Sequence, residues 1–396
     1  MFLLPAFASA QPGEVNPYLL TTHPLGMWVS RINPNFQSQP VSEKEIRFGF
    51  SGGNVWLPPV AGYIPADPEV RAQMEKLIWY HRNHVFLRQP IAADRLYFAA
   101  DGILREFRAQ YLLPLPRSQQ LSLGFRAYFL GGGKPPFSLL ISDGFIEWFH
   151  SYVAGGEDPF ARKVYGFNRA GFHFRDEKGH NYRMEAGDIV FPGLELDYHW
   201  FPVIRRNRLG VIANMGIHLG VNTSRYNVSF DPGASFAATR AFLWEKGHKL
   251  KISAGISVLY PGVFGNPAPV RFITAKRIHT LSWEINYRKT LDEKTALSVG
   301  LYYYCQSPYR QRSEYKSLVL YGPEISSHWH YALSHLYKSA ENWSLYFTVE
   351  KKRYNFSVYI REDFKVNNAP DMQTGIQFSL PLSSASRTVS APVRGF

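Results

Sequence analysis

The residues of this chain that could do chemistry are charged and imidazole side chains placed at every second position of alternating segments. Such spacing puts them on one face of a sheet. They are Glu106, Arg108, Arg126, Glu195, Asp197, His199, His218, Lys251, Glu284, Arg288, Glu350, Arg361 and, at a strand end where alternation need not hold, Glu362. Acids and bases are mixed, which favours mutual pairing in a filled or tightly gated interior over a single-sign ring that selects ions.

Hydrolysis inside such an interior would need a Ser, a His and a polar orienting group converging on one wall. His218 lies close in sequence to Asn222, Thr223 and Ser224, and His279 lies close to Ser282. No pair stands at a convincing cross-strand spacing. We therefore expect no enzyme, with an outer-membrane phospholipase as the minor alternative.

A metal site is not expected either. The loop histidines that could form one are His150, His328, His330 and His335, but loop histidines in an aromatic context are more often solvated or stacked. Cys305 is the single cysteine, so no intrachain disulfide is possible, and its neighbours predict a small lipid-facing side chain. No cofactor is predicted.

The elements that must position the charged residues are strands. Period-2 alternation recurs along most of the chain; between 280 and 288 it sets Leu281, Trp283, Ile285 and Tyr287 against Ser282, Glu284, Asn286 and Arg288. The same pattern predicts twelve strands, near 45–56, 95–113, 119–130, 188–203, 209–220, 232–245, 248–260, 276–290, 294–307, 342–351, 354–363 and 372–382. In the sixth, placing Phe242 and Trp244 outward also sends Arg240 into lipid, and the face of Arg240 stays open.

The lengths of the connections predict the architecture. Links after every second strand are short, and the others are longer, near 57–94, 131–187, 221–231, 261–275, 308–341 and 364–371. Short turns at one end and long loops at the other are typical of an all-β, transmembrane, antiparallel up-and-down β-barrel of about 12 strands, with short periplasmic turns and long extracellular loops. An even number of strands leaves both ends of the barrel sequence on the periplasmic side.

Composition agrees with a barrel in the outer membrane of a Gram-negative bacterium. Aromatic residues make up 16% of the 396 residues, the mean hydropathy is −0.23, and no stretch after the N-terminus has 18 or more apolar residues. Residues 1–10 end in Ala8-Ser9-Ala10, which fits the remainder of a signal peptide, so residues 11–396 form the single predicted domain.

The formal net charge of +13 indicates a polyanionic partner. For an outer-membrane barrel, that polyanion is lipopolysaccharide, next to membrane lipid itself. No RNA-binding aromatic motif and no block of Lys and Arg is present, so nucleic acid is discounted. We expect a monomer.

Two long loops have helical spacing, at 67–82 and 143–153. The second is too apolar to extend freely into water, and we expect it to cover the barrel mouth as a lid rather than to form a ligand site. The lid residues are Phe145, Ile146, Glu147, Trp148, Phe149 and His150.

Two segments resemble an uncharacterised outer-membrane family, the domain of unknown function numbered thirty-one eighty-seven. The first is the stretch 142–150 with Gly155, Gly156, Glu157 and Arg162 after it; the second is 359–363, followed by 369–372 and 375–378. The second is similar to the closing hairpin of that family, although this chain continues past its last strand. The resemblance implies an outer-membrane barrel and no established activity.

Together these observations predict a narrow or gated channel for small polar solutes. The alternative is a non-conducting structural barrel whose basic extracellular loops bind lipopolysaccharide or a surface partner.

Overall fold

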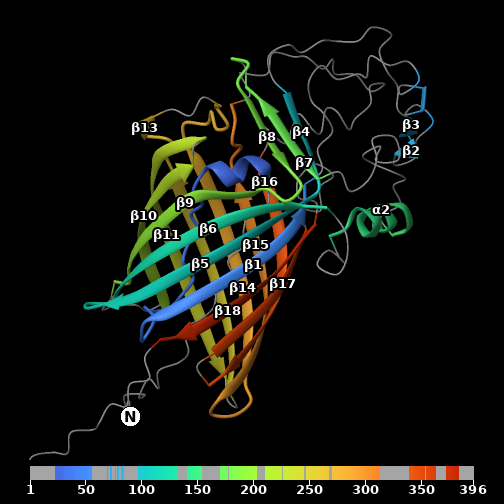
Figure 1. Ribbon diagram of the computed structural model, residues 1–396. Coiled ribbons are helices and arrows are strands. Elements are labelled where there is room, and N and C mark those ends of the chain that lie inside the picture. The colour runs from blue at the N-terminus through green and yellow to red at the C-terminus, as the bar shows by residue number, and fades with distance from the viewer. Residues whose placement is uncertain are drawn as a thin grey trace, which may run out of the picture.

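The computed structural model describes residues 23–55, 97–132, 141–153, 170–202, 210–311, 339–362 and 372–382, apart from a few positions within them, together with isolated positions between 69 and 83. Twelve antiparallel strands of this described part form a closed barrel (Figure 1). The ring closes because β1 pairs with both β5 and β18, while β10 pairs with both β9 and β11.

The wall strands, in chain order, are β1 (Glu45–Asn54), β5 (Ile103–Leu115), β6 (Gln119–Gly131), β9 (Ile189–Trp200), β10 (Val211–Ser224), β11 (Asn227–Trp244), β12 (His248–Leu259), β14 (Ile278–Thr290), β15 (Thr295–Gln306), β16 (Ala340–Lys351), β17 (Tyr354–Glu362) and β18 (Met372–Pro381). Each of the twelve predicted strands corresponds to one of them. The up-and-down fold class and the common end for the first and last strands are thereby confirmed, since Glu45 lies opposite Pro381.

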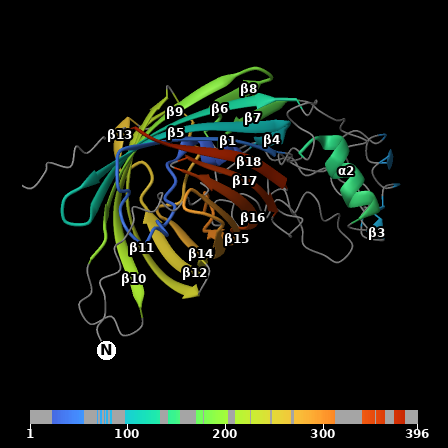
Figure 2. The same ribbon diagram turned by 90° about the horizontal axis from the view of Figure 1, so that it is seen from below.

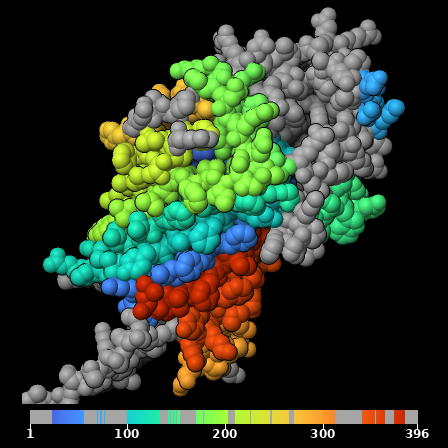
Figure 3. Space-filling view, viewed as in Figure 1, coloured from blue at the N-terminus to red at the C-terminus, as the bar shows by residue number. Residues whose placement is uncertain are grey.

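Alternation separates an apolar outer face from a polar inner face. On β17, Phe356 and Val358 are exposed while Ser357 and Tyr359 are buried. The other strands repeat this pattern, with outward side chains that include Phe48, Phe50, Phe107, Leu123, Phe236, Ile256, Leu281, Val299, Leu345, Phe347, Ile376 and Phe378. Such a belt suits lipid, and the space-filling view shows the wall as a continuous surface (Figure 3).

Three sequence predictions need correction. The segment 95–113 is not one strand, because β4 (Tyr97–Asp101) leaves the barrel and pairs with β7 (Gly171–Arg175) outside it. The predicted long link 221–231 is mostly strand: β10 and β11 pair from Ser224 opposite Asn227, so only a two-residue turn joins them. In the stretch 67–82, the pair β2 (Ile78–Trp79) and β3 (Arg82–Asn83) replaces the end of the predicted helix.

The face of Arg240 is settled. Its side chain is on the outer face, with the guanidinium carbon 4.7 Å from the centre of the Phe242 ring. Both residues lie near the end of β11 that carries the short turn, where a cation can reach the headgroup region while its stem covers apolar surface. Cys305 is likewise on the outer face of β15, as predicted.

The long connections lie at the end of the barrel opposite to the short turns, where they build a second layer (Figure 1). There β4, β7 (Gly171–Arg175) and β8 (Asn181–Glu185) form a three-stranded sheet, and β13 (Phe264–Asn266) pairs with the outer part of β11. Helix α2 (Asp143–Tyr152) starts after the N-cap Ser142, whose hydroxyl accepts a hydrogen bond from the Phe145 amide. No helix in the described ranges is long and apolar enough to cross a membrane.

Candidate functional site

The interior of the barrel is occupied by the chain's own residues 23–44, here called the inner segment. It begins with the 3-10 helix η1 (Pro24–Trp28) near the outer end, where the long connections lie, and runs down the lumen to β1. Seen from below, this segment lies within the ring of strands (Figure 2). Nearly every residue from 23 to 37 is buried. The lumen is therefore occluded along the path of the segment.

Wall side chains satisfy the backbone of the inner segment below η1, where it forms no helix or strand of its own. The amide of Ser30 donates to Asp231 Oδ2 at 2.8 Å, the amide of Arg31 to Glu195 Oε1 at 3.3 Å, and the amide of Val41 to Gln120 Oε1 at 2.9 Å. A buried amide without a partner would cost free energy. These three wall residues thus anchor the segment from its outer part to the short-turn end.

The carbonyls of the inner segment are anchored in the same way. The wall donors are Asn227 to the Trp28 carbonyl, Arg126 to Val29, Ser257 to Ile32, Asn214 to Asn35 and Gln37, and Thr239 and Lys251 to Phe36. Most of these contacts are neutral hydrogen bonds, each of which water could replace. The attachment along the lumen is consequently polar and exchangeable.

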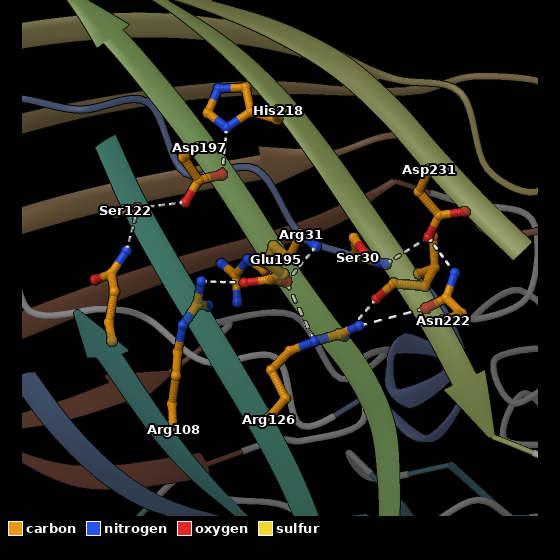
Figure 4. Close-up of polar contacts among 12 residues, drawn as sticks. Ser30, Arg31, Arg108, Ser122, Arg126, Glu195, Asp197, His218, Asn222 and Asp231 are labelled. Carbon is orange, nitrogen blue, oxygen red and sulfur yellow. Dashed lines mark hydrogen bonds and ion pairs between the residues drawn. The ribbon is translucent and has the colours of Figure 1, made fainter. Parts of the chain in front are cut away.

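Glu195 is the centre of the charged contacts (Figure 4). Its carboxylate forms ion pairs with Arg108 and with Arg126 Nε, the latter at 3.2 Å, and also accepts from the Arg31 amide. Each of these three charged side chains is no more than 5% exposed. Charges that far from water need their partners. One carboxylate thereby ties β5, β6 and β9 to the inner segment.

A second cluster lies beside it (Figure 4). Asn222 donates to Asp231 Oδ2 at 2.7 Å and accepts from Arg126 Nη2 at 3.4 Å. Arg126 contacts both Glu195 and Asn222, so it joins the two clusters into one network. In this network Asp231 Oδ2 also accepts from the Ser30 amide. This network surrounds the inner segment near its outer part.

Glycines in three neighbouring strands make room for the inner segment. A Cβ added at Gly220 would overlap Ser30, one at Gly233 would overlap the Ile32 side chain, and one at Gly255 would come within 2.5 Å of Pro34 Cβ. Real side chains do not approach so closely, so a larger residue at these positions requires Ser30, Ile32 or Pro34 to shift. The small residues on the inner faces of β10, β11 and β12 therefore form a track for its backbone.

An aromatic cluster, here called the outer latch, closes the outer end around η1. Trp28 is 1% exposed and stacks on Phe272 with ring centroids 4.6 Å apart. It also meets Tyr182 of β8 and Tyr226 of the β10–β11 turn edge-on, at 4.8 and 5.6 Å. Here the contacts are apolar and dense, whereas the backbone of the segment lower in the lumen is held by polar contacts.

Asp176 holds the loop that supplies Phe272. Its carboxylate accepts hydrogen bonds from the amide of Arg271 at 3.1 Å and from His180 Nδ1 at 2.9 Å. Burial alone would raise the pKa of Asp176, but these hydrogen bonds outweigh it and lower that pKa below its usual value. The outer latch is thus positioned by an ionised carboxylate.

His23 makes the outer latch sensitive to acid. Its Nδ1 accepts from the Leu25 amide at 3.1 Å, and burial lowers its pKa from the ordinary 6.5 to about 3. Docked His23 is neutral, whereas released His23 takes up a proton below about pH 6.5. Docking should weaken as the pH falls from about 6.5 towards 3, by about 1.4 kcal/mol per pH unit at most.

This dependence can be measured by protease cleavage of η1 in the folded barrel between pH 7.5 and pH 4.5. We expect faster cleavage at acidic pH in the wild type, and a flatter profile in His23→Asn, which keeps an acceptor but does not titrate. Equal pH profiles for the two proteins would contradict the assignment to His23.

With one exception, the charged residues proposed from the sequence to line the lumen lie on the inner face. Glu106, Arg108, Arg126, Glu195, His199, His218, Lys251, Glu284 and Arg361 are at most 5% exposed, while Asp197, Arg288 and Glu350 are less deeply buried. The exception is Glu362, because the alternation of β17 turns Tyr359 and Arg361 inward and leaves Glu362 at an outward position. The structure brings Lys251 to 2.9 Å from Glu284, and Arg288 to 2.8 Å from Glu350. Acids and bases therefore do pair across strands, and the inner segment lies among them.

A tyrosine-rich wall faces the other side of the inner segment. Tyr302, Tyr304, Tyr346 and Tyr359 are buried and cluster with Phe36 of the segment. The Arg31 guanidinium carbon lies 4.1 Å from the centre of the Tyr304 ring, within range of a cation–π interaction. The alternation identified these strands, but it did not indicate what their tyrosines would meet.

Helix α2, proposed as the lid, lies to one side of the barrel in both ribbon views (Figures 1 and 2). Trp148 on it is 50% exposed, and Phe145 packs within the helix against Trp148 and Phe149. The role of residues 145–150 as a lid stays a prediction, whereas the segment observed inside the lumen is 23–44. Among the described residues no His, Cys, Asp and Glu cluster could hold a metal, and His328, His330 and His335 lie outside them.

The inner segment was missed by the sequence reasoning because it has no periodicity. It carries prolines at 24, 34 and 40, and its apolar residues follow neither a helical nor a strand pattern. The available signal was an unassigned stretch before the first strand that contains Leu25, Met27, Trp28, Ile32 and Phe36. Apolar side chains of that number need a place away from water. Residues 1–10, predicted as signal peptide, lie outside the described part.

Comparisons with known proteins agree with the architecture only. No family model and no curated protein sequence matches the chain. Among solved structures it is similar to the COG4313 outer membrane channel from Pseudomonas putida F1, at 9% identity and a TM-score of 0.40, over 89% of this chain and 100% of that one. It is also similar to LpxR from Salmonella typhimurium, at 9% identity and a TM-score of 0.39, over 85% and 100%. Likenesses this remote carry no functional argument.

The class of protein follows from the structure itself. A closed 12-strand barrel with an apolar outer belt and a polar, charged interior is a transmembrane β-barrel of the outer membrane, in contact with lipid. Within that class, its distinguishing feature is a lumen occupied by the inner segment.

Proposed function

We propose that the protein is a gated outer-membrane channel for small polar solutes, with the inner segment as its gate. The observation that carries the proposal is how that segment is held: polar, water-replaceable contacts hold its backbone along the lumen, while its aromatic contacts are concentrated in the outer latch and in the Phe36–tyrosine cluster. Backbone hydrogen bonds to the wall can be exchanged for hydrogen bonds to water. Release of the latch and of Phe36 would let water replace the remaining contacts and leave a polar passage.

The charged lining supports polar cargo. Both signs are present and paired on the inner face, for example Lys251 with Glu284 and Arg288 with Glu350. A lining of this kind favours hydrated solutes and gives little selection between cations and anions. We therefore propose weak ion selectivity in the open state.

Planar-bilayer conductance of the refolded protein tests the gate, using Gly220→Ala against Gly124→Ala. Both glycines face inward, but a Cβ at Gly220 overlaps Ser30 of the inner segment, while one at Gly124 meets Glu195 Cβ at an ordinary 3.4 Å. We expect a mostly closed wild type, at least a tenfold higher mean current for Gly220→Ala, and wild-type behaviour for Gly124→Ala. Absence of current from all three proteins at every voltage would refute the channel.

A second candidate function is a closed barrel whose outer loops bind lipopolysaccharide. The observation that favours it is basic side chains on the β7–β8 hairpin at the outer end, where Lys178 and Arg183 are exposed. Salt-sensitive binding of purified lipopolysaccharide, lost in Lys178→Gln with Arg183→Gln, would support this function. Unchanged binding by that double variant would argue against it.

A further inference from the structure

Ser235, His218 and Asp197 lie on adjacent strands and form a hydrogen-bonded chain inside the barrel, here called the relay. His218 Nε2 of β10 lies 2.8 Å from Ser235 Oγ of β11, and His218 Nδ1 lies 2.7 Å from Asp197 Oδ1 of β9. This is the order in which a serine nucleophile, a general base and an orienting carboxylate are connected in serine hydrolases.

The proton positions follow from the partners. An ionised carboxylate only accepts hydrogen bonds, so His218 Nδ1 carries the proton that Asp197 accepts. His218 Nε2 then has its lone pair directed at the Ser235 hydroxyl, which donates to it. That tautomer is the one in which a histidine removes a proton from serine.

The carboxylate of the relay is itself held in place. Ser122 of β6 donates to Asp197 Oδ2 at 2.9 Å, and Gln110 of β5 donates to Ser122 Oγ at 3.0 Å (Figure 4). Both supporting residues are buried. The relay therefore rests on five consecutive wall strands, which gives it the rigid support that a catalytic arrangement needs.

The cross-strand register of β9, β10 and β11 and the glycine at position 216 bring the side chains of the relay together. His218 lies opposite Asp197, and Ser235 lies opposite Gly216, which in turn lies opposite His199. A Cβ on Gly216 would come within 3.0 Å of Ser235 Oγ, His218 Nε2 and His199 Cε1. The three groups therefore fill the volume that a side chain at position 216 would take, and only glycine allows them to come this close.

We propose that Ser235, His218 and Asp197 form an esterase site. Ser235 Oγ bonds to the carbonyl carbon of an ester while His218 Nε2 takes the hydroxyl proton. The bond to the leaving oxygen then breaks, and the alcohol departs with that proton. Water, deprotonated by His218, attacks the acyl-serine, releases the carboxylic acid and restores the serine. His218 is thus the general base in both halves of the reaction.

The face of the barrel wall on which the site lies determines which class of substrate can reach it. Ser235 is on the inner face, so the wall separates it from the lipid chains of the bilayer. A water-soluble acyl ester that enters the lumen fits this position, and a membrane phospholipid does not. The minor sequence alternative of an outer-membrane phospholipase is therefore not the one proposed.

The inner segment covers the site in the closed barrel. Ser235 and His218 are 8% and 5% exposed, and the Ile32 carbonyl accepts from Ser257, the residue directly opposite Ser235 on β12. Pro34 packs beside Gly255 of the same strand. The esterase is accordingly latent until the segment moves.

Covalent labelling by a fluorophosphonate probe, located by mass spectrometry, tests the proposal on full-length folded protein. We expect an adduct on Ser235 that forms at least tenfold faster in Gly220→Ala than in the wild type. His218→Gln and Asp197→Asn are each added to the Gly220→Ala variant. Compared with Gly220→Ala alone, each should slow both labelling and p-nitrophenyl acetate hydrolysis at least tenfold. Ser298→Ala is the matched control, since Ser298 is a buried serine on the inner face of β15, away from the relay, and it should leave both rates unchanged.

Conductance is recorded on the same proteins, so that failure of the esterase proposal can be distinguished from failure of the proposed gate. Ser235→Ala should abolish labelling and hydrolysis and keep the conductance of its parent. Absence of a Ser235 adduct in both the wild type and Gly220→Ala would overturn the esterase whatever current they carry. Labelling that does not depend on His218 would overturn it as well.

Discussion

Trp28→Ala is expected to open the barrel. Trp28 is 1% exposed and contacts Phe272, Tyr182 and Tyr226, so it is the central aromatic residue of the outer latch. Removing a buried Trp costs about 3–5 kcal/mol. That loss falls on the docked state of η1, because the wall strands keep their own hydrogen bonds without it. In planar bilayers we expect the mostly closed wild type to become a mostly open variant.

Trp148→Ala provides the matched control. It removes the same side chain from α2, where Trp148 is half exposed and lies outside the lumen. We expect its conductance to equal that of the wild type. The opposite result, with Trp148→Ala open and Trp28→Ala closed, would restore the 143–153 segment as the lid and refute the inner segment as the gate.

Glu195→Gln is expected to destabilise the barrel and to loosen the inner segment together. The substitution removes the partner of two buried guanidinium groups, those of Arg108 and Arg126. Breaking a buried ion pair by removing one partner costs about 3–5 kcal/mol, since the remaining charge stays buried without compensation. We expect a lower urea midpoint of unfolding, measured by the gel mobility of folded and unfolded barrel, and faster proteolysis of residues 29–41.

Glu350→Gln tests whether the size of this destabilisation depends on how deeply the ion pair is buried. Glu350 also pairs with an arginine, Arg288, but its side chain is 12% exposed and that of Arg288 is 15% exposed. Water near this pair should limit the loss to well below that of Glu195→Gln. Equal losses for the two variants would contradict the role given to Glu195 as the buried anchor of the inner segment.

The wall could be predicted from the sequence because the alternation within each strand decides which side chains face lipid and which face the lumen. Leu281, Trp283 and Ile285 alternate with polar residues whether or not their neighbours are known. The continuation of β11 towards Asn227 was not readable, because Asp231, Pro232 and Gly233 have the composition of a turn. Only their pairing with β10 makes these residues a strand.

The site was less predictable than the wall. Ser235, His218 and Asp197 meet because two cross-strand registers align, and a register cannot be read from either strand alone. Sequence proximity pointed instead from His218 to Ser224, six residues further along the same strand. The inner segment escaped prediction for a related reason: its conformation is imposed by wall residues such as Asp231 and Asn214, far away in the sequence.

The continuity of the inner segment with β1 has a consequence for biogenesis. Residue 44 leads directly into β1, and β1 forms the seam with β18 that joins the first and last strands of the barrel. A ring of hydrogen-bonded strands admits no chain from the side. If the nascent sheet curls around the segment before the seam is sealed, Arg126 and Glu195 meet the Val29 carbonyl and the Arg31 amide while water is still present. The segment would then already lie in place, held by the wall, when the seam between β1 and β18 closes.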